Sequence, residues 1–338
     1  MKRLYIATDK ALAIARQRDG EWVVDPQLTG LATQCLAVDP QQPGEVYCGT
    51  FGQGLWHSND AGRTWENVGT NIIREQVMSV AISPLERSNG QSVIYAGTEP
   101  SAIFRSADGG ATWRDLATLR QLPSAPTWSF PPRPYTSHVR WMTPDPLQPG
   151  RLYAAIEAGA LLRSFDSGET WEDRKPDGPF DTHTLAMHTL APNRLYSAAG
   201  DGFVESDNGG DTWYRPDEGL NHHYLWSVAV DHADPDTLVI SAAHGPQQAH
   251  NPMSAESAVY RRSHNSPWQQ VRAGLPGEKG LLTFVLTANP AEPGVFYAGS
   301  NQGIFRSADA GVSWEAFPVH WPDNFHMGRV HALVVVEE

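Results

Sequence analysis

The chain has 338 residues, and its 25 basic and 38 acidic side chains give a formal net charge of −13. This negative charge argues against nucleic acid or an anionic membrane surface as the main partner. No stretch approaches the roughly 20 apolar residues of a membrane-spanning helix, and the first residues lack the apolar core of a secretory signal, which predicts a cytoplasmic protein. The 30 glycines, 26 prolines and 12 tryptophans favour a many-stranded β protein.

Short strand-like segments follow one another along the whole chain. Residues 1–24 contain three of them, and six longer units follow, each beginning with a more apolar strand that ends near a proline. These first strands are expected at 35–40, 77–84, 138–146, 183–192, 225–235 and 281–290, and a further strand of this type, 330–336, stands alone at the C-terminus. The units therefore read as sets of four short antiparallel strands.

The two cysteines, Cys35 and Cys48, fall in the first two strands of the second unit. If residue 36 pairs with residue 47, the two thiols face each other across the strands. We interpret them as reduced, buried side chains rather than as a redox or metal site, because structural disulfides are uncommon in the cytosol.

An octet ending in tryptophan recurs along the chain. It reads Ser-Asn-Asp-Ala-Gly-Arg-Thr-Trp at 58–65 and returns at 106–113, 164–171, 206–213 and 307–314, with degenerate copies at 19–22 and 263–268. The Asp or Asn side chain accepts backbone hydrogen bonds, and glycine supplies a positive φ, so each octet predicts a hairpin turn. The tryptophan packs against the neighbouring unit. We therefore expect these Ser and Asp residues to be structural rather than catalytic.

The two ends of the chain complete each other. Residues 1–24 lack the first strand of a unit, and the C-terminal strand lacks a unit of its own. Together they make one four-stranded blade, which brings the total to seven. The sequence thus predicts an all-β, seven-bladed β-propeller formed by residues 1–338 as a single domain, closed by pairing of the C-terminal strand with the N-terminal strands.

The octets resemble the Asp-box, or bacterial neuraminidase repeat (BNR), family, whose propellers occur in sialidases, sortilin-type receptors and photosystem II assembly factors. The resemblance covers nearly the whole chain and implies that the octet turns lie opposite the active site. Sialidases of this superfamily use three arginines, a Tyr–Glu pair and an Asp acid/base. This sequence lacks their Arg-Ile-Pro motif before the first octet, so no sialidase residue is carried over.

A functional site is expected at the mouth of the ring opposite the octet turns, where the loops 114–138, 172–183, 214–224, 243–257 and 315–329 meet. Nine of the 13 histidines fall in these loops or at the starts of first strands. Imidazoles from several blades suit a divalent transition metal such as Zn, Cu, Mn or Fe. The predicted metal ligands are His138, His183, His223, His244 and His331. The predicted catalytic residues are Arg140 and Glu157, and the predicted ligand-binding residues are Trp128, Tyr135, Arg74 and Arg329.

Three functions follow from these features. The first is a propeller that binds a small polar molecule in a His-rich funnel and acts as a metal-dependent hydrolase or lyase. The second is a non-enzymatic scaffold or assembly factor that binds a protein partner. The third is a sialidase-like glycoside hydrolase, which needs two carboxyl groups, or a tyrosine and a carboxyl group, facing each other in the funnel.

Overall fold

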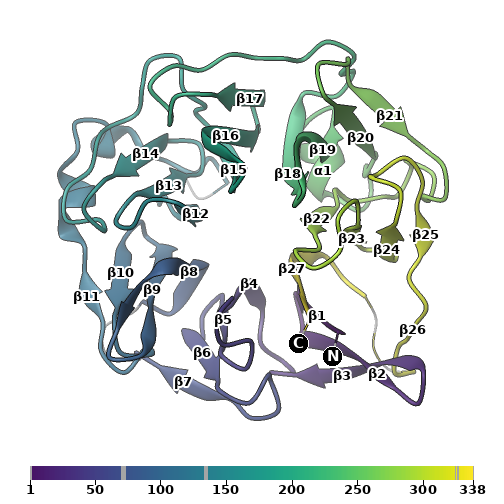
Figure 1. Ribbon diagram of the computed structural model, residues 1–338, viewed down its shortest axis with the longest axis horizontal. Coiled ribbons are helices and arrows are strands. Elements are labelled where there is room, and N and C mark those ends of the chain that lie inside the picture. The colour runs from purple at the N-terminus through teal and green to yellow at the C-terminus, as the bar shows by residue number, and fades with distance from the viewer. Residues whose placement is uncertain (1, 70–73, 133–135, 324, 326, 338) are drawn as a thin grey trace.

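The computed structural model describes residues 2–69, 74–132, 136–323, 325 and 327–337. Seven antiparallel sheets stand as blades around a central axis (Figure 1). The first blade contains β27 (Val330–Glu337), β1 (Lys2–Thr8), β2 (Leu12–Arg18) and β3 (Glu21–Gln27), with β26 (Val319–His320) added in parallel beside β3. The prediction of a seven-bladed, all-β propeller is confirmed.

The other blades follow in chain order. Blade 2 contains β4 (Thr33–Val38), β5 (Val46–Thr50), β6 (Leu55–Ser58) and β7 (Glu66–Val68); blade 3 contains β8 (Gln76–Ser88), β9 (Gln91–Glu99), β10 (Ile103–Ser106) and β11 (Arg114–Asp115). Blade 4 contains β12 (Val139–Pro144), β13 (Leu152–Ile156) and β14 (Ala160–Ser164); blade 5 contains β15 (Thr182–His188), β16 (Ala191–Ala199) and β17 (Gly202–Ser206). Blade 6 contains β18 (Tyr224–Asp231), β19 (Asp234–Ala243), β20 (Ser257–Ser263) and β21 (Gln269–Val271); blade 7 contains β22 (Val285–Ala288), β23 (Phe296–Ser300), β24 (Gly303–Ser307) and β25 (Glu315–Ala316).

Blades 4 and 5 have three strands rather than the expected four. A single bridge stands in place of each fourth strand, between Arg163 and Glu172 in blade 4 and between Glu205 and Tyr214 in blade 5. Among the described residues, the remaining elements are two short 3-10 helices, η1 (Ala117–Gln121) and η2 (Ala125–Thr127), and one α-helix, α1 (Pro246–His250). In the described part of the chain, no helix is both long and apolar enough to cross a membrane.

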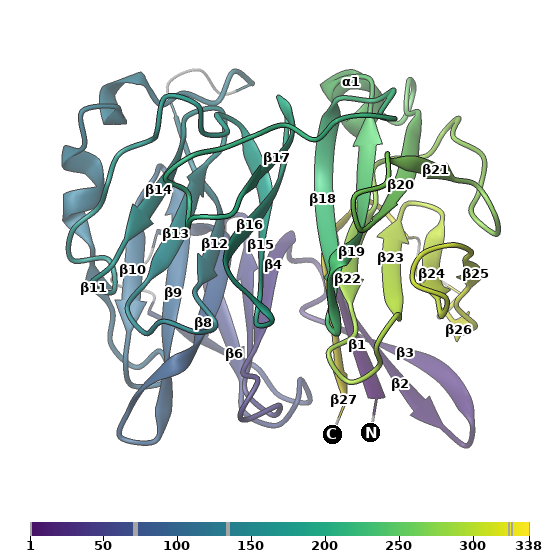
Figure 2. The ribbon, with the colours of Figure 1, turned by 45° about the horizontal axis from the view of Figure 1, so that its top comes forward.

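The ring closes between the ends of the chain. Strand β27 pairs antiparallel with β1, from Lys2 opposite Glu337 to Ala7 opposite Ala332. Both termini lie side by side at the end of the molecule opposite α1 (Figure 2). The expected pairing of the C-terminal strand with the N-terminal strands is confirmed, and it leaves β27 as the innermost strand of its blade.

A buried tyrosine in each blade helps to hold the blades together. The seven residues are Tyr5, Tyr47, Tyr95, Tyr153, Tyr196, Tyr260 and Tyr297, and their rings are almost fully buried. Three of the hydroxyls donate to backbone carbonyls in an octet turn of the neighbouring blade, at Ala61, Gly109 and Gly209. Each of these rings therefore contributes apolar packing and one specific hydrogen bond between blades.

The turn at 58–65 has the hydrogen bonds that its sequence predicts. Asp60 accepts hydrogen bonds from the backbone N–H groups of Arg63 and Thr64 and from the Thr64 hydroxyl, and Gly62 has a φ of +81°. The bond from the Thr64 backbone is the main reason that the pKa of Asp60 is lowered. The backbone and hydroxyl bonds from the Thr or Ser four residues on recur at Asp108, Asp166 and Asp309. These carboxylates therefore stabilise turns.

The expected cysteine pairing was wrong by one residue. Leu36 lies opposite Cys48, and Cys35 lies opposite Gly49, because a β-bulge between Thr33 and Cys35 shifts the register. Cys35 packs in the core between blades 2 and 3 and Cys48 in the core between blades 1 and 2, and both thiols are free and buried. Burial raises the pKa of Cys35 to about 12, which makes it unreactive.

The bulge in β4 has counterparts in most of the inner strands. In six blades, one residue near the start of the inner strand is skipped by the pairing with the second strand. We call these six residues the bulge ring: Gln34, Met78, Arg140, His183, Trp226 and His331. A bulge turns a side chain out of the normal alternation. Five members, all except His183, line the central cavity.

Candidate functional site

The candidate site lies at the mouth of the central channel near α1. The channel forms a cavity of about 330 Å³ lined by residues from all seven inner strands. This mouth is built from the beginnings of the inner strands and from the connections between second and third strands, such as β13–β14 and β19–β20 (Figure 2). Most residues that line the channel are apolar, and the lining side chains Arg140 and His331 belong to the bulge ring at this mouth.

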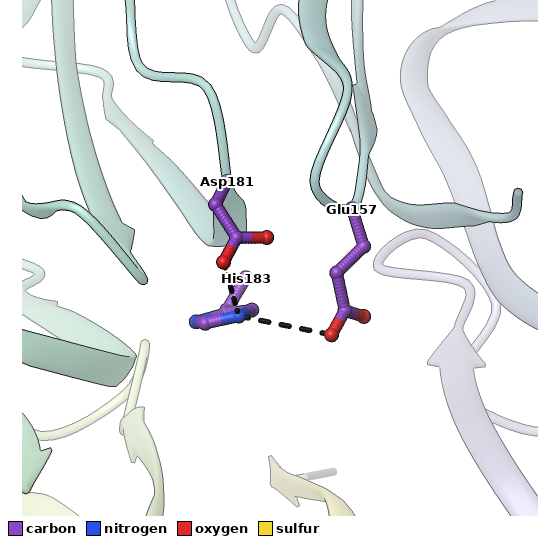
Figure 3. Close-up of side chains that lie close together, drawn as sticks. All are labelled: Glu157, Asp181 and His183. Atoms are coloured by element: carbon purple, nitrogen blue, oxygen red, sulfur yellow. Dashed lines mark ion pairs between the residues drawn. The ribbon is translucent and has the colours of Figure 1, made fainter. Parts of the chain in front are cut away.

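Three further side chains at this mouth, Glu157, Asp181 and His183, point toward one another (Figure 3). Glu157 follows β13 in the turn to β14, and Asp181 and His183 lie at the start of β15. Nε2 of His183 lies 3.8 Å from Oε1 of Glu157 and 3.6 Å from Oδ2 of Asp181. All three donor atoms lie within 4.8 Å of one another, and Glu157 and His183 are buried.

The second polar atom of each of these side chains is occupied by another partner. Oδ1 of Asp181 accepts the backbone N–H of Ala158 at 2.7 Å. Oε2 of Glu157 accepts a hydrogen bond from Nε2 of His138 at 2.6 Å. Nδ1 of His183 donates to the carbonyl of Leu225 at 2.6 Å. These bonds fix the three side chains so that their remaining donor atoms meet at one point.

The two carboxyl groups have pKa values shifted in opposite directions. Burial alone would raise the pKa of Glu157, but the hydrogen bond from His138 and the nearby charges of His183 and Arg140 lower it overall. Burial raises the pKa of Asp181, and the neighbouring Glu157 carboxylate adds to the effect although His183 opposes it. Glu157 is therefore the group that stays ionised, and Asp181 is the one that more readily holds a proton.

A chain of hydrogen bonds reaches His183 from the opposite side. Nη2 of Arg329 donates to Nδ1 of His250 at 2.8 Å, and Nε2 of His250 lies 2.9 Å from the hydroxyl of Tyr224. That hydroxyl lies 3.4 Å from Nε2 of His183. Burial, together with the charge of Arg329, lowers the pKa of His250 to about 2, so this imidazole is neutral at pH 7.

Two guanidinium groups lie against the indole of Trp226. The Cζ atom of Arg140 is 4.4 Å, and that of Arg329 4.8 Å, from the ring centroid. Nε of Arg140 also lies 3.6 Å from Oε2 of Glu157. Cation–π contacts of this kind hold the two guanidiniums beside the carboxylates and place positive charge at the same mouth.

The structure brings together five of the predicted site residues in one network: Arg140, Glu157, His138, His183 and Arg329. His331 lies at the same mouth, where its Nε2 is 2.6 Å from Oδ1 of Asp9. Four residues of this network, Asp9, Asp181, Tyr224 and His250, were not among the predicted site residues. Asp181 and Tyr224 each lie two residues before a bulge-ring residue, but the sequence does not mark where the bulges fall.

The other predicted residues lie elsewhere. His223 is exposed; its neighbour His222 instead packs against His244 with the ring centroids 4.1 Å apart. Trp128 packs in the core cluster that contains Ile156, and its indole donates to the Ser124 hydroxyl. Arg74 is exposed. Tyr135 lies outside the described residues.

Comparisons with known proteins show likeness in the fold. No family model matches the chain. The xyloglucanase Xgh74A of Acetivibrio thermocellus is 25% identical over 214 residues, which make up 58% of this chain and 22% of that protein. The resemblance of the octets to the Asp-box family therefore stays a prediction.

Solved propellers of two kinds are similar in structure. The GH74 enzyme of Niastella koreensis has a TM-score of 0.69 at 18% identity over 93% of this chain and 52% of that one. YCF48 from Cyanidioschyzon merolae has a TM-score of 0.59 at 14% identity over 87% of each chain, and a structure of YCF48 bound to D1 peptide has a TM-score of 0.57 at 16% identity over 85% of this chain and 82% of that one. The chain thus spans about half the length of the Niastella enzyme and about a fifth of the xyloglucanase.

Proposed function

We propose that this protein binds a small polar molecule at the channel mouth through a transition-metal ion held by Glu157, Asp181 and His183. One observation carries the proposal: three donor atoms of suitable type meet at one point while the other polar atom of each side chain is occupied. Metal-binding histidines usually donate their second ring N–H to a carbonyl or carboxylate, as His183 does to Leu225.

The spacing and charge of the donors support this proposal. Two ligands of a tetrahedral ion with bonds of about 2.1 Å lie about 3.4 Å apart, close to the 3.6 and 3.8 Å distances from His183 to the two carboxylates. An ion with two positive charges, as the sequence analysis expects, would neutralise both carboxylates. Three protein ligands leave a position for the bound molecule, and the ion would act there as a Lewis acid on an oxygen atom. A metal-dependent hydrolase or lyase is the activity that we propose.

Metal analysis tests this function. We expect protein that is stripped with a chelator and then equilibrated with Zn²⁺ to retain about one ion per chain after gel filtration. His183→Ala removes the central ligand and should weaken metal binding by at least about 100-fold. Loss of a residue that only hydrogen-bonds to a metal ligand already weakens binding by about 10–100-fold. His320→Ala is the matched control, since this exposed histidine lies in β26 at the outer edge of the first blade.

Retention of metal by the His320 variant but not by the His183 variant supports the proposal. Wild-type protein that retains no zinc, copper, manganese or iron would contradict it. In that case the contacts of His183 with Glu157 and Asp181 are structural.

Glycoside hydrolysis without metal is the second candidate, and it uses the same residues. The funnel contains the two carboxyl groups and the tyrosine that this alternative requires, in Glu157, Asp181 and Tyr224. Their opposite pKa shifts are those of a general acid, Asp181, beside an ionised carboxylate, Glu157. Reducing ends released from xyloglucan in excess chelator, and lost in Asp181→Asn, would favour this candidate over the metal-dependent one.

The non-enzymatic alternative concerns the opposite face. Leu85, Leu147 and Leu190 are 42, 42 and 64% exposed in or beside the turns between the first two strands of blades 3, 4 and 5. Exposed leucines on successive blades are typical of a surface that binds another protein. If this face carries the function, replacing the three leucines with serine should abolish recovery of a co-purifying partner and leave metal binding unchanged.

A further inference from the structure

The central channel next to the proposed metal site is large enough to hold part of a bound molecule. Its volume of about 330 Å³ lies within the range of about 300–1,000 Å³ that is usual for small-molecule sites. Most of its lining residues are apolar, and several are only half-buried although they lie inside the ring: Trp141, Ala186, Met187, Val285 and Val334. Apolar surface exposed in a concave space favours a ligand with an apolar part.

Methionine side chains make one side of this channel adaptable. Met78, Met142 and Met187 line it from three successive blades, 3, 4 and 5. Methionine is unbranched and polarizable, so it can pack against apolar groups of different shapes. This wall can therefore adjust to a flexible apolar chain.

Arg140 connects the channel with the metal site. Its side chain lines the channel, contacts the ring of Trp226 and lies beside Glu157. Within the described residues, its buried Nε has no hydrogen-bond acceptor, and Oε2 of Glu157, at 3.6 Å, is too distant for a hydrogen bond. Buried donors are nearly always satisfied, so this guanidinium needs an acceptor from outside the described chain.

The proposed metal ion makes a negatively charged acceptor more favourable. An ion with two positive charges neutralises Glu157 and Asp181, so these carboxylates no longer balance the charge of Arg140. A guanidinium presents its N–H groups as a planar fork whose geometry matches a carboxylate. A carboxylate at the open end of the channel therefore fits both the charge and the shape of Arg140.

We propose that the bound molecule is a straight-chain monocarboxylate, whose carboxylate accepts hydrogen bonds from Arg140 and whose apolar chain lies in the channel. This inference rests on the proposed function and names the class of its ligand. Each methylene group that leaves water should strengthen binding by about fourfold until the channel is full. Arg140 provides the selectivity for a carboxylate, since a hydrogen bond to a charged group changes affinity by at least about 10-fold.

Calorimetric titration of zinc-loaded protein with carboxylates from acetate to decanoate tests the role of the channel. We expect about one molecule bound per chain, and an affinity that rises by about fourfold per methylene group before it levels off. Ala186→Leu fills part of the channel from a half-buried position of β15, so the affinity should level off at a shorter chain. Ala316→Leu, at an exposed position of β25, is the matched control and should behave as wild type.

Octanoate and 1-octanol, which have chains of equal length, test the role of Arg140. Wild-type protein should bind octanoate at least about 10-fold more tightly than 1-octanol. Arg140→Gln should remove this preference, whereas the dependence of affinity on chain length remains. Arg63→Gln, at an exposed arginine in the turn at 58–65, is the matched control and should retain the preference.

The outcomes separate this inference from the function on which it rests, because the metal content is measured before any carboxylate is added. Zinc-loaded protein that binds acetate and octanoate equally well, or that binds neither, overturns the inference and leaves metal binding standing. A preference for octanoate that persists in Arg140→Gln overturns the role of Arg140. Wild-type protein that retains no metal ion overturns the function itself.

Discussion

Removal of the last nine residues, 330–338, should leave a chain that does not fold. These residues contain β27, whose Val330, Leu333 and Val335 are only 2, 5 and 5% exposed. Each such side chain contributes about 1.5–3 kcal/mol through burial, and the truncation also removes the hydrogen bonds to β1. Since a typical domain is stable by only about 5–15 kcal/mol, the loss is comparable with the whole free energy of unfolding.

Circular dichroism during a thermal scan is the measurement. We expect wild-type protein to unfold in one cooperative step, and the truncated chain to show no transition. Deletion of residues 337–338 alone is the control, because it removes the ion pair between Lys2 and Glu337 at the edge of β27 and little of the core. A truncated chain that unfolds cooperatively near the wild-type temperature would show that ring closure is not required.

Glu205→Gln should destabilise the protein by about 3–5 kcal/mol, the usual result of removing one partner from a buried ion pair. Glu205 in β17 is almost fully buried, and its carboxylate lies 2.8 Å from Nη2 of Arg194 and 2.6 Å from Nη2 of Arg262. Arg262 belongs to β20, so this carboxylate joins blades 5 and 6. The substitution leaves two guanidiniums close together without the charge that balances them.

Urea unfolding at neutral pH gives the change in the free energy of unfolding. Glu169→Gln serves as control, because Glu169 forms a bidentate ion pair with Arg114 on the surface, where both side chains are about half exposed. Exposed pairs contribute about 0–1 kcal/mol. Equal effects of the two substitutions would mean that the Glu205 pair does not stabilise the contact between blades.

The fold could be predicted because its signals are local and repeated. The Asp–Gly turn, the tryptophan that follows it and the incomplete first blade can all be read directly, and together they give the number of blades and the closure by β27. The strand register could not be read in the same way. A bulge adds one residue to a strand without a distinctive composition, so the partner of Cys35 was placed one residue off.

The candidate site was predicted in part for the same reason. His138, His183, Arg140, Glu157 and Arg329 were selected from loops and strand starts, and they do meet. The sequence could not show that His183 lies at a bulge and joins the site, whereas His223 lies exposed in the connection before β18. The roles of Tyr224 and His250 depend on hydrogen bonds between blades, which no spacing within one blade reveals.

The bulge ring also provides positions at which a propeller of this kind can gain or lose reactive side chains. Each bulge residue is excluded from strand pairing, so its side chain can be replaced with less effect on the cores between blades than at a paired position. Gln34 and Met78 hold positions equivalent to Arg140 and His183 but have side chains that do not ionise. One scaffold can therefore acquire a different set of reactive groups, a single substitution per blade at a time, while its architecture stays the same.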